Sequence, residues 1–372
     1  MVIKHEKIRS TKQAGKKNRP NSSVSKIPSP FAPKGKALFV GIDLGTSRAS
    51  IAASNGVREV MPTYVGYPKD NISEELLGNK PLFGDAALKH RLSLELVRPL
   101  AHGVIQNNGK SGNNKYLTAA KQLVRYLLQK ARPKPGQPVY GVIGAPARAS
   151  IASKRILIDA ASGILDAVMI VSEPFTVAYE LGVLDQALVI DIGAGTVDLC
   201  RLHGTLPQNQ DQITLDQAGD YVDDALSKII RKKYPKAQFS INMVRKLKER
   251  HGFVSENSDR VKAKFPVDGR PREFDVTDEL RKACKSIVPG MVSSIAKLIA
   301  TYDPEFQQAL RSNVILAGGG SQMVGLPELI EDAMDELGGG QVSRVDEPLF
   351  AGSNGALKMA RRMPVHFWKV LT

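Results

Sequence analysis

The residues best suited to chemistry lie in the stretch Leu188–Cys200. An apolar run ends at Asp191, a turn follows with Gly193, Ala194, Gly195 and Thr196, and a second apolar run begins. This pattern predicts a β-hairpin whose turn can hold an anion on its backbone N–H groups. A carboxylate beside a phosphate is favourable when a divalent cation lies between them, and Mg²⁺ is the usual ion. An ordinary glycine-rich hairpin with a capping aspartate is the alternative.

A second stretch, Phe39–Ile51, repeats this pattern in the first half of the chain. Its apolar run ends at Asp43, the turn contains Gly45, Thr46 and Ser47, and the apolar residues then resume. Two such hairpins suggest a duplicated domain with a phosphate clamp made from both halves. The repetition favours a nucleotide site over two structural turns.

Glu173 is a third candidate for chemistry. Ser172 fits the N-cap of a helix and Pro174 fits its first turn, so Glu173 is expected at a helix start that faces the cleft. It either complements the helix dipole or orients and activates a water molecule.

A run of three glycines, Gly318, Gly319 and Gly320, lies between a predicted buried strand from Val314 and a predicted helix over 326–337. Between a strand and a helix, glycines let the backbone approach a flat ligand closely. A loop that only reverses the chain is the alternative.

The bulk composition is that of a globular protein. The chain has 372 residues, enough for one large two-lobed domain or two domains, and 42% of them are hydrophobic. No apolar run approaches the roughly 20 residues of a membrane-spanning helix, and no secretory signal is evident at the N-terminus. The two cysteines, Cys200 and Cys284, form no metal or redox motif, which favours a cytoplasmic location.

Much of the net charge of +15 lies in residues 1–36, where ten Lys and Arg face a single acid, Glu6. This segment is rich in Lys, Ser, Asn and Pro, and we expect it to be disordered. It is either an electrostatic arm for an acidic partner, a nucleic acid or an anionic membrane, or a solubilising leader without a partner. The absence of an amphipathic stripe disfavours a membrane-anchoring helix.

Periodicity predicts alternating strands and helices for the rest of the chain. The strands are expected at 37–42, 48–54, 57–64, 139–145, 167–171, 205–214 and 341–345. The helices are expected at 116–131, 147–163, 221–233, 241–250, 326–337, one or two within 275–302, and a last one from Glu347.

Five segments in this order resemble the actin/Hsp70/sugar-kinase ATPase superfamily. They are the first hairpin, the helix after Ser172, the second hairpin, the triple-glycine segment and the final helix, which correspond to Gly41–Ser47, Ser172–Gly182, Ile190–Asp198, Leu316–Leu326 and Asp346–Ala356. The resemblance implies an α/β, duplicated ribonuclease-H-like fold with two lobes and a nucleotide cleft between them. Lobe I would comprise 37–182 plus 348–372 with an insertion near 65–105, and lobe II would comprise 183–347 with an insertion near 225–274.

Within the superfamily the chain is most similar to actins. Four segments carry this likeness: Pro62–Pro68, Phe83–Ala86, Arg98–Ile105 and Val244–Val254. Five further segments resemble a branch of bacterial actins from magnetotactic cells that organise magnetosomes into chains: Val65–Asp70, Pro146–Ser150, Val171–Phe175, Asp191–Thr196 and Ala317–Ser321.

The resemblance also implies roles for the candidate residues, with ATP or ADP and Mg²⁺ as cofactors. Asp43 and Asp191 would hold a hydrated Mg²⁺ on the phosphates, the two turns would cradle those phosphates, and Glu173 would position the attacking water. The ribose or base of the nucleotide would be contacted by Gly219, Asp220, Lys248 and Glu249. The adenosine would lie above the backbone of Gly318, Gly319, Gly320 and Ser321.

The implied function is a filament-forming cytoskeletal ATPase that polymerises with itself and positions magnetosomes, with magnetosome-associated proteins as further partners. Hydrolysis would then time disassembly, because the site at the lobe interface couples turnover to lobe rotation. A filament that segregates plasmid or other DNA is one alternative, since the basic segment 1–36 suits a nucleic acid. A soluble sugar-kinase-type phosphotransferase is the other.

Overall fold

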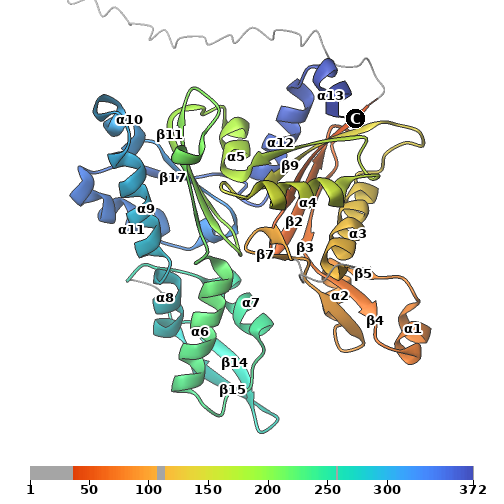
Figure 1. Ribbon diagram of the computed structural model, residues 1–372. Coiled ribbons are helices and arrows are strands. Elements are labelled where there is room, and N and C mark those ends of the chain that lie inside the picture. The colour runs from red at the N-terminus through yellow and green to blue at the C-terminus, as the bar shows by residue number, and fades with distance from the viewer. Residues whose placement is uncertain (1–36, 107–113, 257–258, 372) are drawn as a thin grey trace, which may run out of the picture. The chain divides into compact units, whose positions relative to one another are not determined.

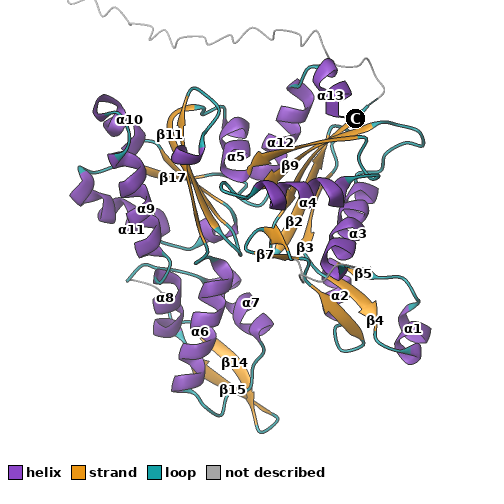
Figure 2. Ribbon diagram, viewed as in Figure 1, coloured by secondary structure: helices purple, strands orange, loops and turns teal. Residues whose placement is uncertain are grey.

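The computed structural model describes residues 37–106, 114–256 and 259–371 (Figure 1). The disorder expected for residues 1–36 lies outside this range. The described residues contain two five-stranded sheets, each covered by helices (Figure 2). We call the first sheet with its helices lobe I and the second sheet with its helices lobe II.

The two sheets have the same strand order, which confirms the predicted duplication. Lobe I has the order β10-β9-β1-β2-β3, made of Ala167–Ser172, Val139–Ala145, Leu38–Leu44, Arg48–Ala53 and Arg58–Pro62. Lobe II has the order β17-β16-β11-β12-β13, made of Val342–Arg344, Val314–Ala317, Asp185–Ile192, Val197–His203 and Gln212–Leu215. The central strand of each sheet pairs in the same way on its two sides. In lobe I, β1 pairs antiparallel with β2 and parallel with β9, and in lobe II, β11 pairs antiparallel with β12 and parallel with β16.

The central strands are apolar because helices cover both of their faces. Val40 and Ile42 of β1, like Leu188 and Ile190 of β11, are fully buried. Helices α3 (Lys115–Lys130) and α4 (Ile151–Ala161) belong to lobe I. Lobe II has α8 (Thr277–Lys285), α9 (Val288–Ala300), α10 (Gln307–Arg311) and α11 (Leu326–Met334), with short 3₁₀ turns at Asn209–Asp211, Pro304–Phe306, Gly319–Gln322 and Asp335–Leu337.

Two helices cross where the chain passes between the lobes. Helix α5 (Glu173–Leu181) follows β10 of lobe I and leads into β11, whereas α12 (Ala351–Arg362) returns from lobe II (Figure 1). Their approach is close, because a Cβ at Gly355 of α12 would collide with the Thr176 carbonyl of α5. A final helix, α13 (Val365–Leu371), follows Pro364, so the single last helix expected from Glu347 is in fact two helices, the first of which begins at Ala351.

Each lobe carries an inserted group of elements. In lobe I it contains β4 (Val65–Pro68), α1 (Asn71–Leu77), β5 (Leu82–Phe83), α2 (Gly84–Lys89) and β6 (Leu94–Val97), followed by the hairpin β7 (Leu100–Ala101) and β8 (Val104–Ile105). In lobe II it contains α6 (Gly219–Lys233), α7 (Ile241–His251), β14 (Lys262–Val267) and β15 (Arg270–Asp275). The lobe boundaries inferred from the sequence stay a prediction.

Two predicted elements were wrong in extent. The strand expected over 205–214 is only Gln212–Leu215, because Gly204 turns the chain at φ 81° and the buried Asp211 accepts a hydrogen bond from the backbone N–H of Gln208. The helix expected from residue 147 begins at Ile151, where the Ser150 hydroxyl accepts from the N–H of Ser153.

One helical stretch of the described residues, Thr277–Ala300, is long and apolar enough to cross a membrane by length and composition alone. It comprises α8 and α9. Its buried side chains, among them Leu280, Met291 and Ile295, pack in the core of lobe II. Such packing is typical of a core helix.

Candidate active site

The two predicted hairpins place their aspartates at equivalent positions. Asp43 is the penultimate residue of β1, opposite Ser50 of β2, and Asp191 is the penultimate residue of β11, opposite Asp198 of β12. A single apolar residue, Leu44 or Ile192, separates each aspartate from its glycine-rich turn. The local sequence therefore positions both carboxylates at the same edge of their sheets.

Both turns open into one cavity of about 1470 Å³ that is lined by residues of both lobes. Every site residue expected from the sequence lines this cavity except Ser321: Asp43, Gly45, Thr46, Ser47, Glu173, Asp191, Gly193, Ala194, Gly195, Thr196, Gly219, Asp220, Lys248, Glu249, Gly318, Gly319 and Gly320. Ser321 is fully buried, and its hydroxyl donates to the Gly318 carbonyl at 2.8 Å. Its position supports the glycine loop from behind.

The two turns touch each other across the cavity floor. A Cβ at Gly195 of lobe II would collide with the Thr46 hydroxyl and lie 2.9 Å from the Cα of His102 and 3.0 Å from the amide nitrogen of Gly103. The Gly103 N–H donates to the Thr46 hydroxyl at 2.8 Å, so the β7–β8 hairpin holds the first turn. Only glycine at position 195 permits this approach.

Glycines also pack against both aspartates. A Cβ at Gly352, in α12, would lie 3.1 Å from Oδ2 of Asp43. A Cβ at Gly318, where φ is +76°, would collide with Oδ1 of Asp191. The backbone of α12 and the loop after β16 therefore lie directly against the two carboxylates.

The carboxylates concentrate negative charge at the bottom of the cavity. Burial raises the pKa of Asp43 to about 6. Burial, reinforced by Asp43, Asp198 and Asp191, raises the pKa of Glu173 well above its ordinary value. Burial, with Asp43 and Asp198, raises the pKa of Asp191 likewise. Within the described residues none of these three acids has a Lys or Arg ion-pair partner.

A cation would relieve this repulsion, since an opposite charge within a few ångströms stabilises the ionised carboxylates. No group of three or more His, Cys, Asp or Glu side chains in the described part of the chain is arranged to ligate one metal ion directly. Two carboxylates, Asp43 of lobe I and Asp191 of lobe II, suit a hydrated cation held through water and ligand oxygens, which is the coordination Mg²⁺ favours.

Asp198 is a functional candidate that was missed in the sequence. Its Oδ1 accepts from the Ala147 N–H of lobe I at 2.8 Å and from the Thr214 hydroxyl at 2.6 Å. It is 1% exposed, and burial raises its pKa. The available signal was a lone acid in the apolar run that follows the second turn.

The residues expected near a ribose or base are held by the start of α6. The Gly219 N–H donates to the Gly193 carbonyl at 3.1 Å and the Asp220 N–H donates to the Ala194 carbonyl at 2.7 Å, so α6 begins against the second turn. The Lys248 ammonium donates to the Gly219 carbonyl at 2.6 Å. Glu249 pairs with Arg48 of lobe I at 3.0 Å.

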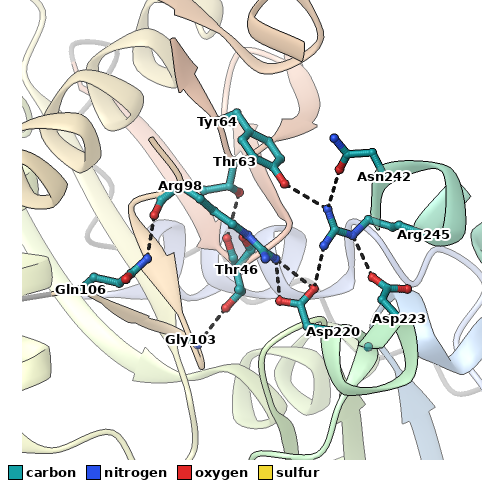
Figure 3. A network of polar contacts seen from close by, with 12 residues as sticks. Thr46, Thr63, Tyr64, Arg98, Gly103, Gln106, Asp220, Asp223, Asn242 and Arg245 are labelled. Atoms are coloured by element: carbon teal, nitrogen blue, oxygen red, sulfur yellow. Dashed lines mark hydrogen bonds and ion pairs between the residues drawn. The ribbon is translucent and has the colours of Figure 1, made fainter. Parts of the chain in front are cut away.

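A polar network that was also missed joins the lobes near these residues (Figure 3). Arg98 pairs with Asp220 at 2.8 Å, and Arg245 pairs with both Asp220 and Asp223, at 3.2 and 2.9 Å. The Arg245 guanidinium also donates to the Tyr64 hydroxyl at 3.0 Å. Arg98 and Arg245 lie inside segments that resemble actins, but their pairing depends on contacts between distant parts of the chain.

Comparison with known proteins places this architecture in a family. The sequence profile described as MreB/Mbl protein matches residues 37–366. The chain belongs to the MreB/Mbl family. The present chain is 36% identical to the actin-like protein MamK of Paramagnetospirillum magneticum (strain ATCC 700264 / AMB-1). The match extends over 334 residues, which is 90% of this chain and 95% of the relative. The likeness to the magnetosome actins that the sequence suggested is confirmed.

Solved structures agree with this assignment. A MamK double helical filament matches with a TM-score of 0.85 and 36% identity, covering 88% of this chain and 100% of that chain. A non-polymerising MamK mutant bound to AMPPNP matches with a TM-score of 0.67 and 36% identity, covering 87% and 99%. The actin-like, two-lobed fold expected for this MreB/Mbl protein is thereby confirmed.

Proposed function

We propose that this chain is an actin-like cytoskeletal ATPase that binds ATP with Mg²⁺ between its lobes, polymerises, and hydrolyses ATP to drive filament turnover. The observation that carries this proposal is that two Asp–glycine turns from opposite lobes meet in one cavity. Among the residues that the structure describes, Asp43, Asp191 and Glu173 in this cavity have no Lys or Arg ion-pair partner, and burial raises the pKa of each. Two findings about relatives support it: one similar structure is a filament, and another, a non-polymerising mutant, is bound to AMPPNP.

The two turns and the two aspartates hold the phosphates and their cation. The backbone N–H groups of Gly45–Ser47 and of Ala194–Thr196 bind phosphate oxygens from opposite sides. The Gly193 N–H donates to the Thr196 carbonyl at 2.9 Å and closes the second turn. Asp43 and Asp191 would hold a hydrated Mg²⁺ through its water shell, and the cation would neutralise charge on the phosphates. The pKa of both aspartates falls when the cation is present, because the ionised forms are then favoured.

Glu173 positions the water that attacks the terminal phosphate. It begins α5 directly after β10, in the cavity wall and within electrostatic reach of Asp43, Asp191 and Asp198. In phosphoryl transfer, placement and charge stabilisation supply most of the acceleration. A carboxylate that orients the water therefore suffices as the protein's contribution at this point.

The adenosine lies against the glycine loop and the start of α6. Gly318, Gly319 and Gly320 present backbone without side chains to the cavity. Asp220, Lys248 and Glu249 also line the cavity and provide polar groups for the ribose and base. Ser321 acts indirectly, since its hydroxyl bonds the Gly318 carbonyl.

The cargo proposed for the filament is a chain of magnetosomes in the cytoplasm, with magnetosome-associated proteins as partners. It rests on the relatives named MamK and on the resemblance of five segments to magnetosome-organising actins. A DNA-segregating filament remains the second candidate because residues 1–36 are strongly basic. Salt-sensitive DNA binding that disappears when residues 1–36 are deleted would favour it.

Sedimentation and phosphate release test the proposal together. With Mg-ATP the protein should pellet, and without nucleotide it should stay in the supernatant. Glu173→Ala should still assemble, but its rate of phosphate release should fall by about 100-fold, so that its filaments persist. A protein that never pellets contradicts the filament, and unchanged phosphate release in Glu173→Ala removes Glu173 from the mechanism.

A further inference from the structure

Arg98 lies where the first phosphate turn meets the second lobe. It follows β6 and precedes the β7–β8 hairpin of lobe I. Its Nε–H donates to the Thr46 backbone carbonyl at 2.8 Å, and its Nη2 pairs with the Asp220 carboxylate of lobe II at 2.8 Å (Figure 3). One guanidinium therefore touches both the turn and the facing lobe.

The same hairpin holds Thr46 at a second point. The Gly103 N–H at its tip donates to the Thr46 hydroxyl, and the Gln106 amide donates to the Arg98 carbonyl at 2.9 Å. Thr46 is 5% exposed. Its backbone carbonyl is thus held by Arg98, just before the hairpin, and its hydroxyl by Gly103, at the hairpin tip, so a displacement of Arg98 is transmitted to the turn.

Asp220 is held in place from the opposite side. Arg245 of α7 binds Asp220 through Nη2 and Asp223 through Nε, and it donates to the hydroxyl of Tyr64 in lobe I. Lys248 pairs with the other oxygen of Asp223 at 2.7 Å. Two arginines share Asp220, Arg98 from lobe I and Arg245 from α7. When Arg98 moves away, Asp220 loses one of these two cationic partners and keeps Arg245, which also binds Asp223.

We propose that Arg98 is a positioning residue that couples closure of the second lobe to the geometry of the first phosphate turn through Asp220. This inference rests on the proposed function, and it adds a role for Arg98 that the sequence did not indicate. When the lobes are closed, Asp220 holds Arg98, and Arg98 holds Thr46 in the geometry that binds phosphate. When lobe II rotates away, the ion pair breaks and the turn loses one of its anchors.

Arginine is required at this position because its fork supplies separate donors in fixed directions. A lysine carries the same charge on a single ammonium, which reaches the carboxylate or the Thr46 carbonyl but does not present parallel donors to both. Arg98→Lys should therefore keep the charge and lose the coupling.

A double-mutant cycle tests this coupling with ethenoadenosine triphosphate, which is modified on the base, as the fluorescent probe. Arg98→Gln and Asp220→Asn should each raise the dissociation rate of the probe and lower the single-turnover rate of ATP hydrolysis by about tenfold, and the double variant should be no worse than either. Arg98→Lys should lose nearly as much, with an unchanged melting temperature.

The matched control is the other ion pair across the cavity, Arg48 with Glu249. Its side chains are 41% and 37% exposed, against 22% and 31% for Arg98 and Asp220. Exposed ion pairs contribute little coupling energy. The effects of Arg48→Gln and Glu249→Gln on the probe dissociation rate should therefore multiply in the double variant to within about twofold.

Two outcomes overturn the proposal. The first is probe dissociation and hydrolysis by Arg98→Gln within twofold of wild type. The second is multiplicative effects in the Arg98–Asp220 cycle. A wild-type protein that binds the probe but does not hydrolyse ATP contradicts the proposed function instead. In that case the double-mutant cycle, measured by the dissociation rate of the probe, still decides the role of Arg98.

Discussion

The two Asp–glycine turns share a backbone plan and differ in the residue across the strand pair. Asp43 faces Ser50, whose hydroxyl donates to the Ser353 hydroxyl at 2.9 Å. Asp191 faces Asp198, a second buried carboxylate. Duplication preserved the strand order and the aspartate, but the surroundings of the two copies diverged.

This difference concentrates charge on one side of the site. Burial raises the pKa of Asp43 to about 6, whereas Asp191 also has Asp198 nearby and its pKa is raised well above its ordinary value. The Ser50–Ser353 contact ties the first turn to α12 within its own lobe, and Asp198 binds Ala147 across the lobes. The residue opposite Asp43 is therefore bound to α12, whereas the residue opposite Asp191 takes part in holding the lobes together.

Alanine at Gly195 and at Gly45, one glycine from each turn, should give the largest difference between the two turns. A Cβ at Gly195 collides with Thr46 and the hairpin of the other lobe, so Gly195→Ala should force the turns apart and lower kcat/KM by about 100-fold with little change in melting temperature. A Cβ at Gly45 would lie 2.7 Å from the Arg48 carbonyl in its own hairpin, so Gly45→Ala should cost about 1–3 kcal/mol of stability.

Steady-state kinetics and thermal unfolding of both variants check this difference. Arg58→Gln is a suitable control, because Arg58 pairs with Glu347 at 2.8 Å outside the cavity. Equal kinetic losses in the two glycine variants, with equal changes in melting temperature, would show that the second turn has no special relation to the other lobe.

The pH dependence of stability should reveal the unpaired acids. Without nucleotide and Mg²⁺, Asp43 holds a proton more tightly in the folded state, since its pKa is raised from 3.8 to about 6. The resulting stabilisation is present at low pH and is lost as pH rises through 6. Between pH 5 and pH 7.5, wild type should therefore lose about 1–2 kcal/mol more than Asp43→Asn.

Denaturant unfolding at the two pH values measures this loss. Asp198→Asn should also reduce the pH dependence, because Asp198 helps raise the pKa of Asp191 and Glu173, whereas Ser50→Ala should leave it unchanged. Mg-ATP should abolish the difference between wild type and Asp43→Asn. A wild type that is more stabilised than Asp43→Asn on going from pH 5 to pH 7.5 would contradict the assignment of a raised pKa.

The smallest effects should come from the hydrogen bonds opposite the aspartates. Ser50→Ala removes one neutral hydrogen bond and should cost about 1 kcal/mol or less. Thr214→Val takes a donor from the buried Asp198 carboxylate and an acceptor from the Arg148 N–H, so it should cost about 1–3 kcal/mol. Chemical denaturation of the two variants gives the comparison, and a larger loss in Ser50→Ala would reverse it.

Local features of the sequence predicted the parts of the site that depend on neighbouring residues. Asp43 and Asp191 were found because each ends an apolar strand and precedes a glycine turn. Glu173 was found because Ser172 and Pro174 mark a helix start, and α5 begins there. The Ser172 hydroxyl makes no capping hydrogen bond, so the position was right although the capping contact was not.

Features that depend on contacts between distant segments escaped prediction. Asp198 depends on Ala147 of the other lobe, and Arg98 depends on Asp220. The helix expected from residue 147 begins later because Ala147 and Arg148 donate their N–H groups to Asp198 and Thr214 instead of entering the helix. Likewise the strand expected at 205–214 is shorter because Gly204 turns the chain and the buried Asp211 binds the Gln208 N–H and Arg201, the latter at 2.6 Å. No periodicity reveals these contacts.

The most direct test of the central claim is the time course of phosphate release by the wild-type protein, followed together with light scattering after addition of Mg-ATP. The account predicts that scattering rises first and that phosphate then appears, at up to one per assembled subunit in the first round. Assembly that proceeds equally without nucleotide, or phosphate release without any assembly, would contradict it.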